Sequence, residues 1–338
     1  MTTHAKKFGL KKSLLIFATV AISAALAGFF FLFGDTIEAQ LAENSRAGIV
    51  ERNYYPEFQV KQAPRYPHDC TFIGEYLASF GTNGVSYLEP DTLDQVEHKQ
   101  VNFIEPSSGR PLEMKSCDYK YDKLLVGSGR AIKYEESDYH QQGSHLYIFH
   151  DAASWQESPA EELNFNTCGT YDIIDVSDLG VKIYGFWGHY KDCIFVSCNL
   201  FDDIYLIQLG TGNDRFDSGS YHPADQGRYN GSYTVLGHWH QSGQMGKDAA
   251  HGGQYYNGSL YLATNNLGLC TIYKCILHSD HTLSFEALNF DVSGEEHLKY
   301  RYIDGMCISP DGTLYAQPLL VDASNATNMT EMIVSKID

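Results

Sequence analysis

The densest group of metal-binding side chains in the sequence is the segment Gly237-His-Trp-His-Gln. Its two histidines, His238 and His240, are two residues apart, so on an extended strand they lie on the same face and could ligate one ion. His251 follows soon after and is a candidate third ligand. The ion would be divalent, and the sequence leaves Ca²⁺ and Zn²⁺ both open. A surface strand with both histidines facing water and Trp239 facing the core explains the same residues without a metal.

A second set of polar residues stands where short strand pairs begin. It contains two histidines, two carboxylates, a lysine and a tyrosine: His68, Asp69, Lys115, Tyr184, His251 and Asp304. If these side chains converge, they form a polar pocket or a metal site. A divalent cation bound there would polarise a carbonyl group for hydrolysis, with a carboxylate or a histidine as the base.

These residues converge only if the strand pairs that carry them surround a common axis, and the pairs do repeat along the chain. The segments His251–Ala263 and Asp304–Ala316 share one frame, a strand, a tight turn with Gly or Asp, and a second strand. Three further segments fit this frame more loosely, which makes five positions equivalent: Leu77, Leu124, Ile194, Leu260 and Leu314. The position seven residues earlier holds Cys70, Cys117, Trp187, Gly253 and Cys307. Three cysteines in one repeat position predict a shared buried site near the start of an inner strand, not a set of disulfides.

The repeat predicts an all-β fold, a β-propeller of four-stranded blades. Further strand pairs follow the hairpins, for example around the Pro90-Asp91 and Ser279-Asp280 turns. Five blades are detected, and the wide intervals at 125–194 and 194–260 leave room for a sixth. A β-sandwich or another meander is the alternative. Helical periodicity is confined to the short segment 152–163.

The frame Asp304-Gly followed by Pro310-Asp-Gly-Thr-Leu-Tyr resembles the blade motif of gluconolactonase-like and NHL-type propellers. The resemblance covers most of residues 64–338 at the level of architecture and is generic. For a lactonase it implies a metal site at the mouth of the central channel with a Glu and paired Asn ligands. Asn199 and Asn265 do occupy one repeat position, but no Glu stands at the inner position of the first blade, where Glu75 lies on the following strand.

Residues 13–34 form 22 consecutive positions without a charge. As a helix they would span about 33 Å, enough to cross the hydrocarbon core of a bilayer. Four lysines precede this segment, so the sequence predicts a cytoplasmic tail at 1–12, a single-pass transmembrane signal-anchor at 13–34, a stalk at 35–63 and an extracytoplasmic domain at 64–338. The alternative is a signal peptide cleaved after Ala27, which would leave the domain in the same compartment.

Composition and missing motifs exclude several classes of protein. The 338 residues carry a formal net charge of −18, which argues against a nucleic-acid partner. The eight cysteines include no C-x-x-C pair, so zinc-ribbon and thioredoxin-type sites are unsupported. The sequence also lacks a G-x-S-x-G elbow and a P-loop.

The sequence therefore predicts a membrane-tethered β-propeller that binds a protein or glycan partner. The alternative function is a metal-dependent, lactonase-like hydrolase with its site at the channel mouth. Neither the ligand nor the cofactor is fixed by the residues.

Overall fold

The structure is a computed structural model of the chain. It describes residues 50–63, 68–81, 84–104, 112, 114, 116–127, 145–180, 185–190, 192–198, 203–210, 233–240, 249–264, 270–295, 301–320 and 330–337. The chain divides into two units, residues 1–48 and residues 49–338, and the described residues all belong to the second. Within these ranges no helix is long and apolar enough to cross a membrane, and the predicted anchor at 13–34 lies outside them.

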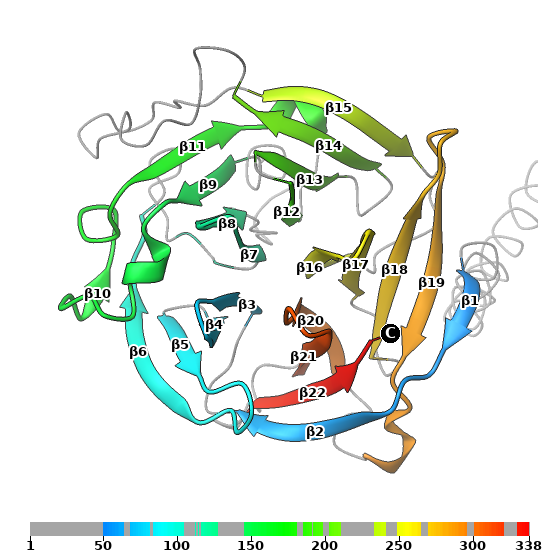
Figure 1. The fold of residues 1–338 in the computed structure, drawn as a ribbon, viewed down its shortest axis with the longest axis horizontal. Coiled ribbons are helices and arrows are strands. Elements are labelled where there is room, and N and C mark those ends of the chain that lie inside the picture. Colours follow the sequence, from blue (N-terminus) through cyan, green and yellow to red (C-terminus); the bar gives the residue numbers. More distant parts are fainter. Residues whose placement is uncertain are drawn as a thin grey trace, which may run out of the picture. The chain divides into compact units, whose positions relative to one another are not determined.

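The described strands of the second unit form five sheets around a central axis, the β-propeller predicted from the repeat (Figure 1). One strand of each sheet lies next to the axis: β3 (Asp69–Ile73), β7 (Ser116–Lys120), β12 (Gly185–Tyr190), β16 (Ala249–Tyr256) and β20 (Arg301–Ile308). The second strands are β4 (Tyr76–Gly81), β8 (Lys123–Gly127), β13 (Cys193–Cys198), β17 (Ser259–Thr264) and β21 (Thr313–Leu320). Each second strand pairs antiparallel with the inner strand before it.

The outer half of each blade comes from the segment that follows, except that the outermost strand of the fifth blade comes from the beginning of the chain. The third strands are β5 (Gly84–Leu88), β9 (His145–Phe149), β14 (Asp203–Leu209), β18 (Thr271–Leu277) and β22 (Thr330–Lys336). The fourth strands are β6 (Gln95–Val101), β11 (Tyr171–Asp175), β15 (Tyr233–His240), β19 (Leu283–Asn289) and β2 (Phe58–Ala63). Because β9–β11 and β14–β15 occupy the wide intervals, the described residues account for five blades without a sixth.

Two short strands add a fifth member to two of the blades. β10 (Glu162–Leu163) pairs parallel with β6, and β1 (Val50–Tyr54) pairs parallel with β19. The described helices are single 3₁₀ turns, η1 (Ala152–Ser154), η2 (Ser177–Leu179) and η5 (Val292–Gly294). The prediction of helix over 152–163 is therefore wrong beyond its first turn, because the segment instead packs Trp155 and Leu163 into the core between the first two blades.

The repeat positions inferred from the sequence occupy structurally equivalent places in the five blades. Leu77, Leu124, Ile194, Leu260 and Leu314 are each the second residue of a second strand, and all are buried. The cysteine position lies on the inner strands, where Cys70, Cys117 and Cys307 are buried. No disulfide joins any of the eight cysteines, although the sulfur atoms of Cys70 and Cys307 lie 3.4 Å apart. Small apolar side chains fit where neighbouring inner strands approach each other.

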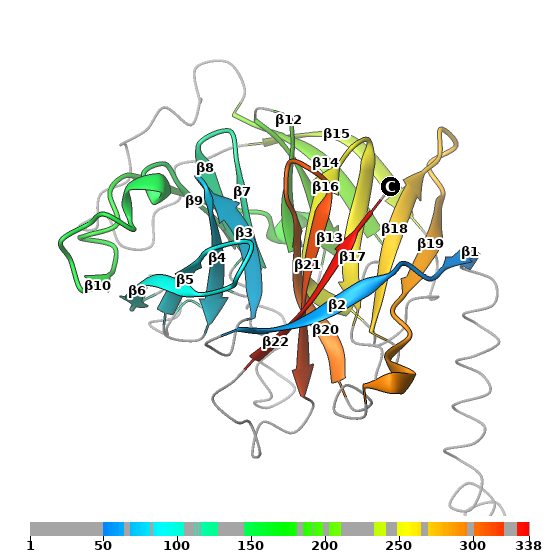
Figure 2. The ribbon, with the colours of Figure 1, turned by 60° about the horizontal axis from the view of Figure 1, so that its bottom comes forward.

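The fifth blade is completed by a strand from the beginning of the chain. β2 pairs antiparallel with β22 in continuous register from Phe58↔Ser335 to Ala63↔Thr330. This corrects the predicted stalk at 35–63, because residues 50–63 belong to the propeller sheets. Sequence periodicity could not reveal this pairing, since the two strands are separated by almost the whole chain. The turned view shows β2 running alongside β22 (Figure 2).

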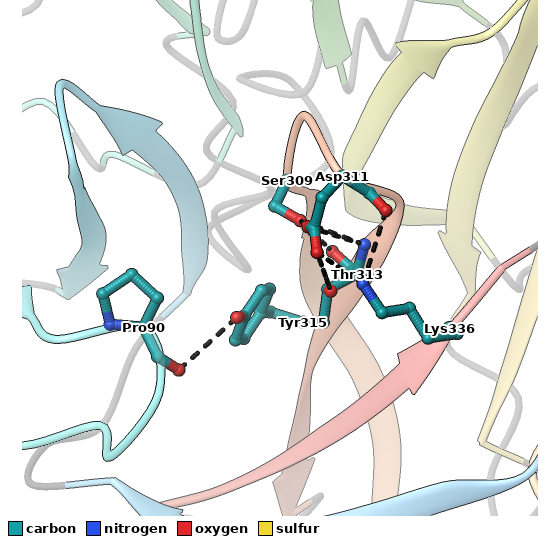
Figure 3. Close-up of polar contacts among 6 residues, drawn as sticks. All are labelled: Pro90, Ser309, Asp311, Thr313, Tyr315 and Lys336. Carbon is teal, nitrogen blue, oxygen red and sulfur yellow. Dashed lines mark hydrogen bonds and ion pairs between the residues drawn. The ribbon is translucent and has the colours of Figure 1, made fainter.

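The turn that follows β20 belongs to the motif that the resemblance rests on. Ser309 and Thr313 donate side-chain hydrogen bonds to the carboxylate of Asp311, and Lys336 of β22 pairs with the same carboxylate (Figure 3). On the next strand, the hydroxyl of Tyr315 donates to the carbonyl oxygen of Pro90 in the first blade at 3.4 Å. The motif therefore holds strands and neighbouring blades together.

Candidate functional site

Asp69, a predicted ligand residue, lies at the axis as the first residue of β3 and is fully buried. Its Oδ1 accepts hydrogen bonds from the backbone N–H groups of Cys70 at 2.9 Å and Met306 at 3.1 Å. Its Oδ2 accepts from the N–H of Cys117 at 2.8 Å. One carboxylate thus joins the inner strands of the fifth, first and second blades.

Burial raises the pKa of the Asp69 carboxyl well above its ordinary value. The three backbone N–H groups act in the opposite direction, and the nearby carboxyl of Asp304 adds to the increase. A buried carboxyl with a raised pKa is a common sign of a catalytic acid. Here the raised pKa follows from burial, and both oxygens of Asp69 are occupied by main-chain donors, so the residue has a bonding role.

Side chains of other inner strands also accept hydrogen bonds from main-chain N–H groups of a neighbouring blade. Inner strands are sheet edges, so their outward N–H groups need partners. Thr71 Oγ1 accepts from Tyr119 N at 2.9 Å, joining the first two blades. Between the second and third blades, the side chain of Ser116 accepts from Phe186 N at 3.2 Å and that of Asp118 from Gly188 N at 2.6 Å. Gln254 accepts from the N–H of Ile308, joining the fourth and fifth.

The inner strands also approach one another closely. A Cβ placed on Gly252 would lie 2.5 Å from the Cα of Gly305, and one on Gly305 would lie 2.5 Å from the Cα of Asp69. β16 contacts β3 and β7, which belong to blades that are not its neighbours in the ring. The side chain of Gln254 reaches Asp118 across the axis and hydrogen-bonds to it. The axis at this level is filled by protein.

A lysine performs a similar role near the other end of the inner strands. Lys120 Nζ donates to the carbonyl oxygen of Gly188 at 3.2 Å and to that of Tyr255, so it links the second, third and fourth blades. Its charge also lies 5.6 Å from the centre of the Tyr255 ring. Burial lowers the pKa of the neighbouring His189, and the Lys120 charge lowers it further.

Of the six predicted channel-mouth residues, Asp69 lies at the axis as described above, and two others, His68 and Asp304, contact each other. His68 Nδ1 lies 3.4 Å from Oδ2 of Asp304, and both side chains are largely buried. His251 lies on the inner strand β16. Lys115 and Tyr184, and the asparagines 199 and 265, lie outside the described residues. The ligand-binding role of the set stays a prediction.

The two histidines predicted to share a face do so, and they meet a residue that the sequence reasoning missed. His238 Nε2 lies 2.6 Å and His240 Nδ1 lies 2.9 Å from Oδ1 of Asp203. Asp203 pairs directly with His240 across strands β14 and β15 of the third blade. Their donor atoms all lie within 4.8 Å of one another. The predicted third ligand, His251, is on β16 in a different sheet.

Asp203 could have been found from the sequence only through the pairing of β14 with β15. Antiparallel pairing places alternate residues of both strands on one face, so once Tyr205 is set opposite His238, Asp203 must face His240. The histidine spacing carries no information about which strand lies beside it. The segment between the two strands, residues 211–232, is long enough to leave the register open.

Comparisons with known proteins show no specific family for this chain. No protein-family model and no curated protein matches the chain. Among solved structures, glutaminyl cyclase from Myxococcus xanthus matches with a TM-score of 0.39 and 9% identity over 85% of this chain and 99% of that one. The PQQ-bound aldose sugar dehydrogenase from Streptomyces coelicolor gives 0.38 and 10% over 83% and 99%. A protein provisionally assigned as a gluconolactonase gives 0.37 and 11% over 78% and 72%. Likenesses this distant carry no information about activity.

Proposed function

We propose that the chain is a membrane-tethered, extracytoplasmic β-propeller that acts as a binding module for a protein partner. The observation that carries this proposal is that polar side chains near the axis accept hydrogen bonds from the main chain of neighbouring blades. Asp69, Asp118 and Gln254 are engaged with main-chain N–H groups of other blades. Groups committed in this way hold a rigid scaffold together, and they are poorly placed to act on a substrate. A hydrolase at the channel mouth is therefore not favoured.

The surface best suited to a partner lies on the outermost strand of the third blade. Val235 and Leu236 of β15 are exposed to 44% and 52%, respectively. The pairing of β14 with β15 shifts at this point, because Leu206 pairs with Gly237 and Ile207 with Val235. Leu236 is left unpaired at a β-bulge, a feature that redirects side chains. Adjacent exposed aliphatic residues favour protein recognition.

The chemistry of the partner follows from these side chains and from the charge of the chain. Sugar rings stack on aromatic side chains, and neither Val235 nor Leu236 can provide such a surface. The net charge of −18 favours a partner whose contact face is apolar with a neutral or basic rim. A glycan is the competing ligand class.

The test uses the purified full chain in a non-denaturing detergent. It is immobilised and exposed in parallel to envelope proteins of the source cell and to a glycan array. We expect saturable retention of a protein, weakened at least about tenfold in Val235→Asp/Leu236→Asp. Ile104→Asp is the matched control because Ile104 is exposed to 44%, and it should bind like the unaltered chain. Equal binding by the double variant, retention only on glycans, or ester or lactone turnover that depends on His68 would overturn the proposal.

The membrane anchor at residues 13–34 is part of the same proposal and is tested by a separate measurement. A helix over residues 13–34 would keep the chain in the membrane pellet after washing with alkaline carbonate. Release of the chain by that wash would contradict the anchor, and a mature N-terminus at Gly28 would replace it with a cleaved signal peptide. Protease added to intact cells should reach the propeller if it lies outside the cytoplasm.

A further inference from the structure

We propose that Asp203, His238 and His240 form a binding site for a divalent transition-metal ion, and that Zn²⁺ is the ion that best fits their donor set. The proposal concerns the outer strands of the third blade and does not depend on partner binding. Two imidazole nitrogens and one carboxylate oxygen are a set that zinc accepts with a fourth position left to water. Ca²⁺ prefers six to eight oxygen ligands, which these residues cannot supply.

The backbone places all three donors on one face before any ion arrives. Asp203 pairs with His240, and Tyr205 pairs with His238, so the four side chains project from the same side of the β14–β15 pair. The ring of His238 is further held by stacking on Tyr205, with the ring centres 4.2 Å apart and the planes at 3°. Little conformational entropy remains to be lost on metal binding.

The distances suit an ion that enters between the donors. The nitrogens of His238 and His240 lie 2.6 Å and 2.9 Å from one oxygen of Asp203. In a tetrahedral zinc shell with bonds of 2.0–2.1 Å, neighbouring donor atoms are about 3.3 Å apart. Side-chain rotations that move each donor by less than about 1 Å would therefore open the shell without moving the strands.

One ligand of the proposed site is buried in the sheet, and the other two are exposed to solvent. The Asp203 side chain is exposed to only 9%, whereas those of His238 and His240 are exposed to 43% and 56%. The carboxylate is thus fixed in the sheet, and the imidazoles meet solvent, from which the ion and its fourth ligand would come. Without a metal ion, the two histidines form hydrogen bonds to the carboxylate of Asp203. The experiment must therefore distinguish histidines that bind a metal from histidines that only donate hydrogen bonds.

The substitution His240→Gln makes that separation. A glutamine amide can still donate to Asp203, but it is a poor zinc ligand. His150→Ala is the matched control, because His150, directly after β9, also contacts a carboxylate, that of Asp172 on β11 of another blade, at 2.8 Å. All proteins are full chains without a histidine tag, stripped with a chelator and kept in a non-denaturing detergent.

Zinc content after equilibrium dialysis and the thermal unfolding midpoint with and without Zn²⁺ are the two readouts. We expect one zinc per chain and a zinc-dependent rise of the midpoint in the unaltered chain and in His150→Ala. His240→Gln should unfold at the same temperature as the stripped unaltered chain and bind zinc at least tenfold more weakly. Equal zinc binding by His240→Gln, no zinc in the unaltered chain, or displacement of zinc by equimolar Ca²⁺ would overturn the proposal.

Discussion

At the scale of single residues, the axis of the propeller depends on a few buried polar groups that serve main-chain donors. Asp69 accepts three N–H groups from three inner strands. Ionising a buried carboxyl is unfavourable, which is why its pKa is raised despite these bonds. Removal of the carboxylate would leave three buried backbone N–H donors without this acceptor.

Asp69→Ala is therefore expected to lower the free energy of unfolding by on the order of 3 kcal/mol or more, since each unsatisfied buried donor costs about 1–3 kcal/mol. Because the folded-state pKa of Asp69 is raised from its ordinary value of 3.8, the folded chain holds this proton more tightly than the unfolded chain. The resulting stabilisation is present at acidic pH and is lost as pH rises through the folded pKa. The loss caused by Asp69→Ala should shrink as pH rises from about 4 upward.

Urea unfolding at several pH values measures both effects. The exposed Asp94→Ala is the control and should change stability by less than about 0.5 kcal/mol at every pH. A destabilisation by Asp69→Ala that grows with pH would contradict the assigned direction of the pKa shift.

At the scale of elements, two of the hairpins that begin blades depend on turns in the left-handed region. The β16–β17 turn uses Asn257 and Gly258 at φ of 44° and 84°, and the β7–β8 turn uses Tyr121 and Asp122 at 53° and 61°. Two residues with positive φ between paired strands form a type I′ turn, for which Asn-Gly is preferred. The β7–β8 turn adopts the same geometry with residues that fit it less well.

The two turns make a matched test of this element. Asp122→Gly should raise the free energy of unfolding by about 0.5–1 kcal/mol, and Gly258→Ala should lower it by about 1–2 kcal/mol. A Cβ at Gly258 would meet no atom within 4 Å, so the loss comes from backbone conformation alone. Asp122→Asn removes only the charge and should have little effect. Chemical denaturation measures all three, and a loss of stability in Asp122→Gly would contradict the assignment.

Elements also show what the sequence could predict and what it could not. The hairpin repeat was detectable because burial at Leu77, Leu124 and Leu314 is local to each strand pair. The shared face of His238 and His240 followed from strand periodicity, whereas their carboxylate partner needed the register of β14. The sequence predicts a ligand-binding role for Asp69, because it does not distinguish a carboxylate that lines a pocket from one that accepts main-chain N–H groups.

At the scale of the whole molecule, a propeller must join its first and last blades, and here several contacts share that task. β2 from the start of the chain completes the fifth blade, and Lys61 of β2 donates to the carbonyl oxygen of Asp91 in the first blade at 2.6 Å. Gln317 of the fifth blade donates to Ser79 of the first at 3.2 Å. Such pairing between distant segments has no local sequence pattern, which is why the sequence alone predicts a stalk that includes residues 50–63.

The closure by β2 predicts a sharp difference between two shortened chains. A chain that begins at residue 49 keeps β1 and β2 and should unfold like the full chain. A chain that begins at residue 64 exposes β22 as a sheet edge and loses the packing of Phe58 on Phe290, whose ring centres are 5.6 Å apart, together with that of Val60. The lost apolar burial and strand pairing should cost on the order of 5 kcal/mol.

Guanidinium unfolding compares the two chains, and a peptide of residues 50–63 provides the control. Because a free sheet edge accepts an added strand, the peptide should restore stability to the chain that begins at 64 in a saturable way. The same peptide with Val60→Asp should fail, since the charge would be buried against the fifth blade. If both shortened chains unfold at the same denaturant concentration, β2 is not needed for closure, and the inner-strand contacts around Asp69 must hold the ring together on their own.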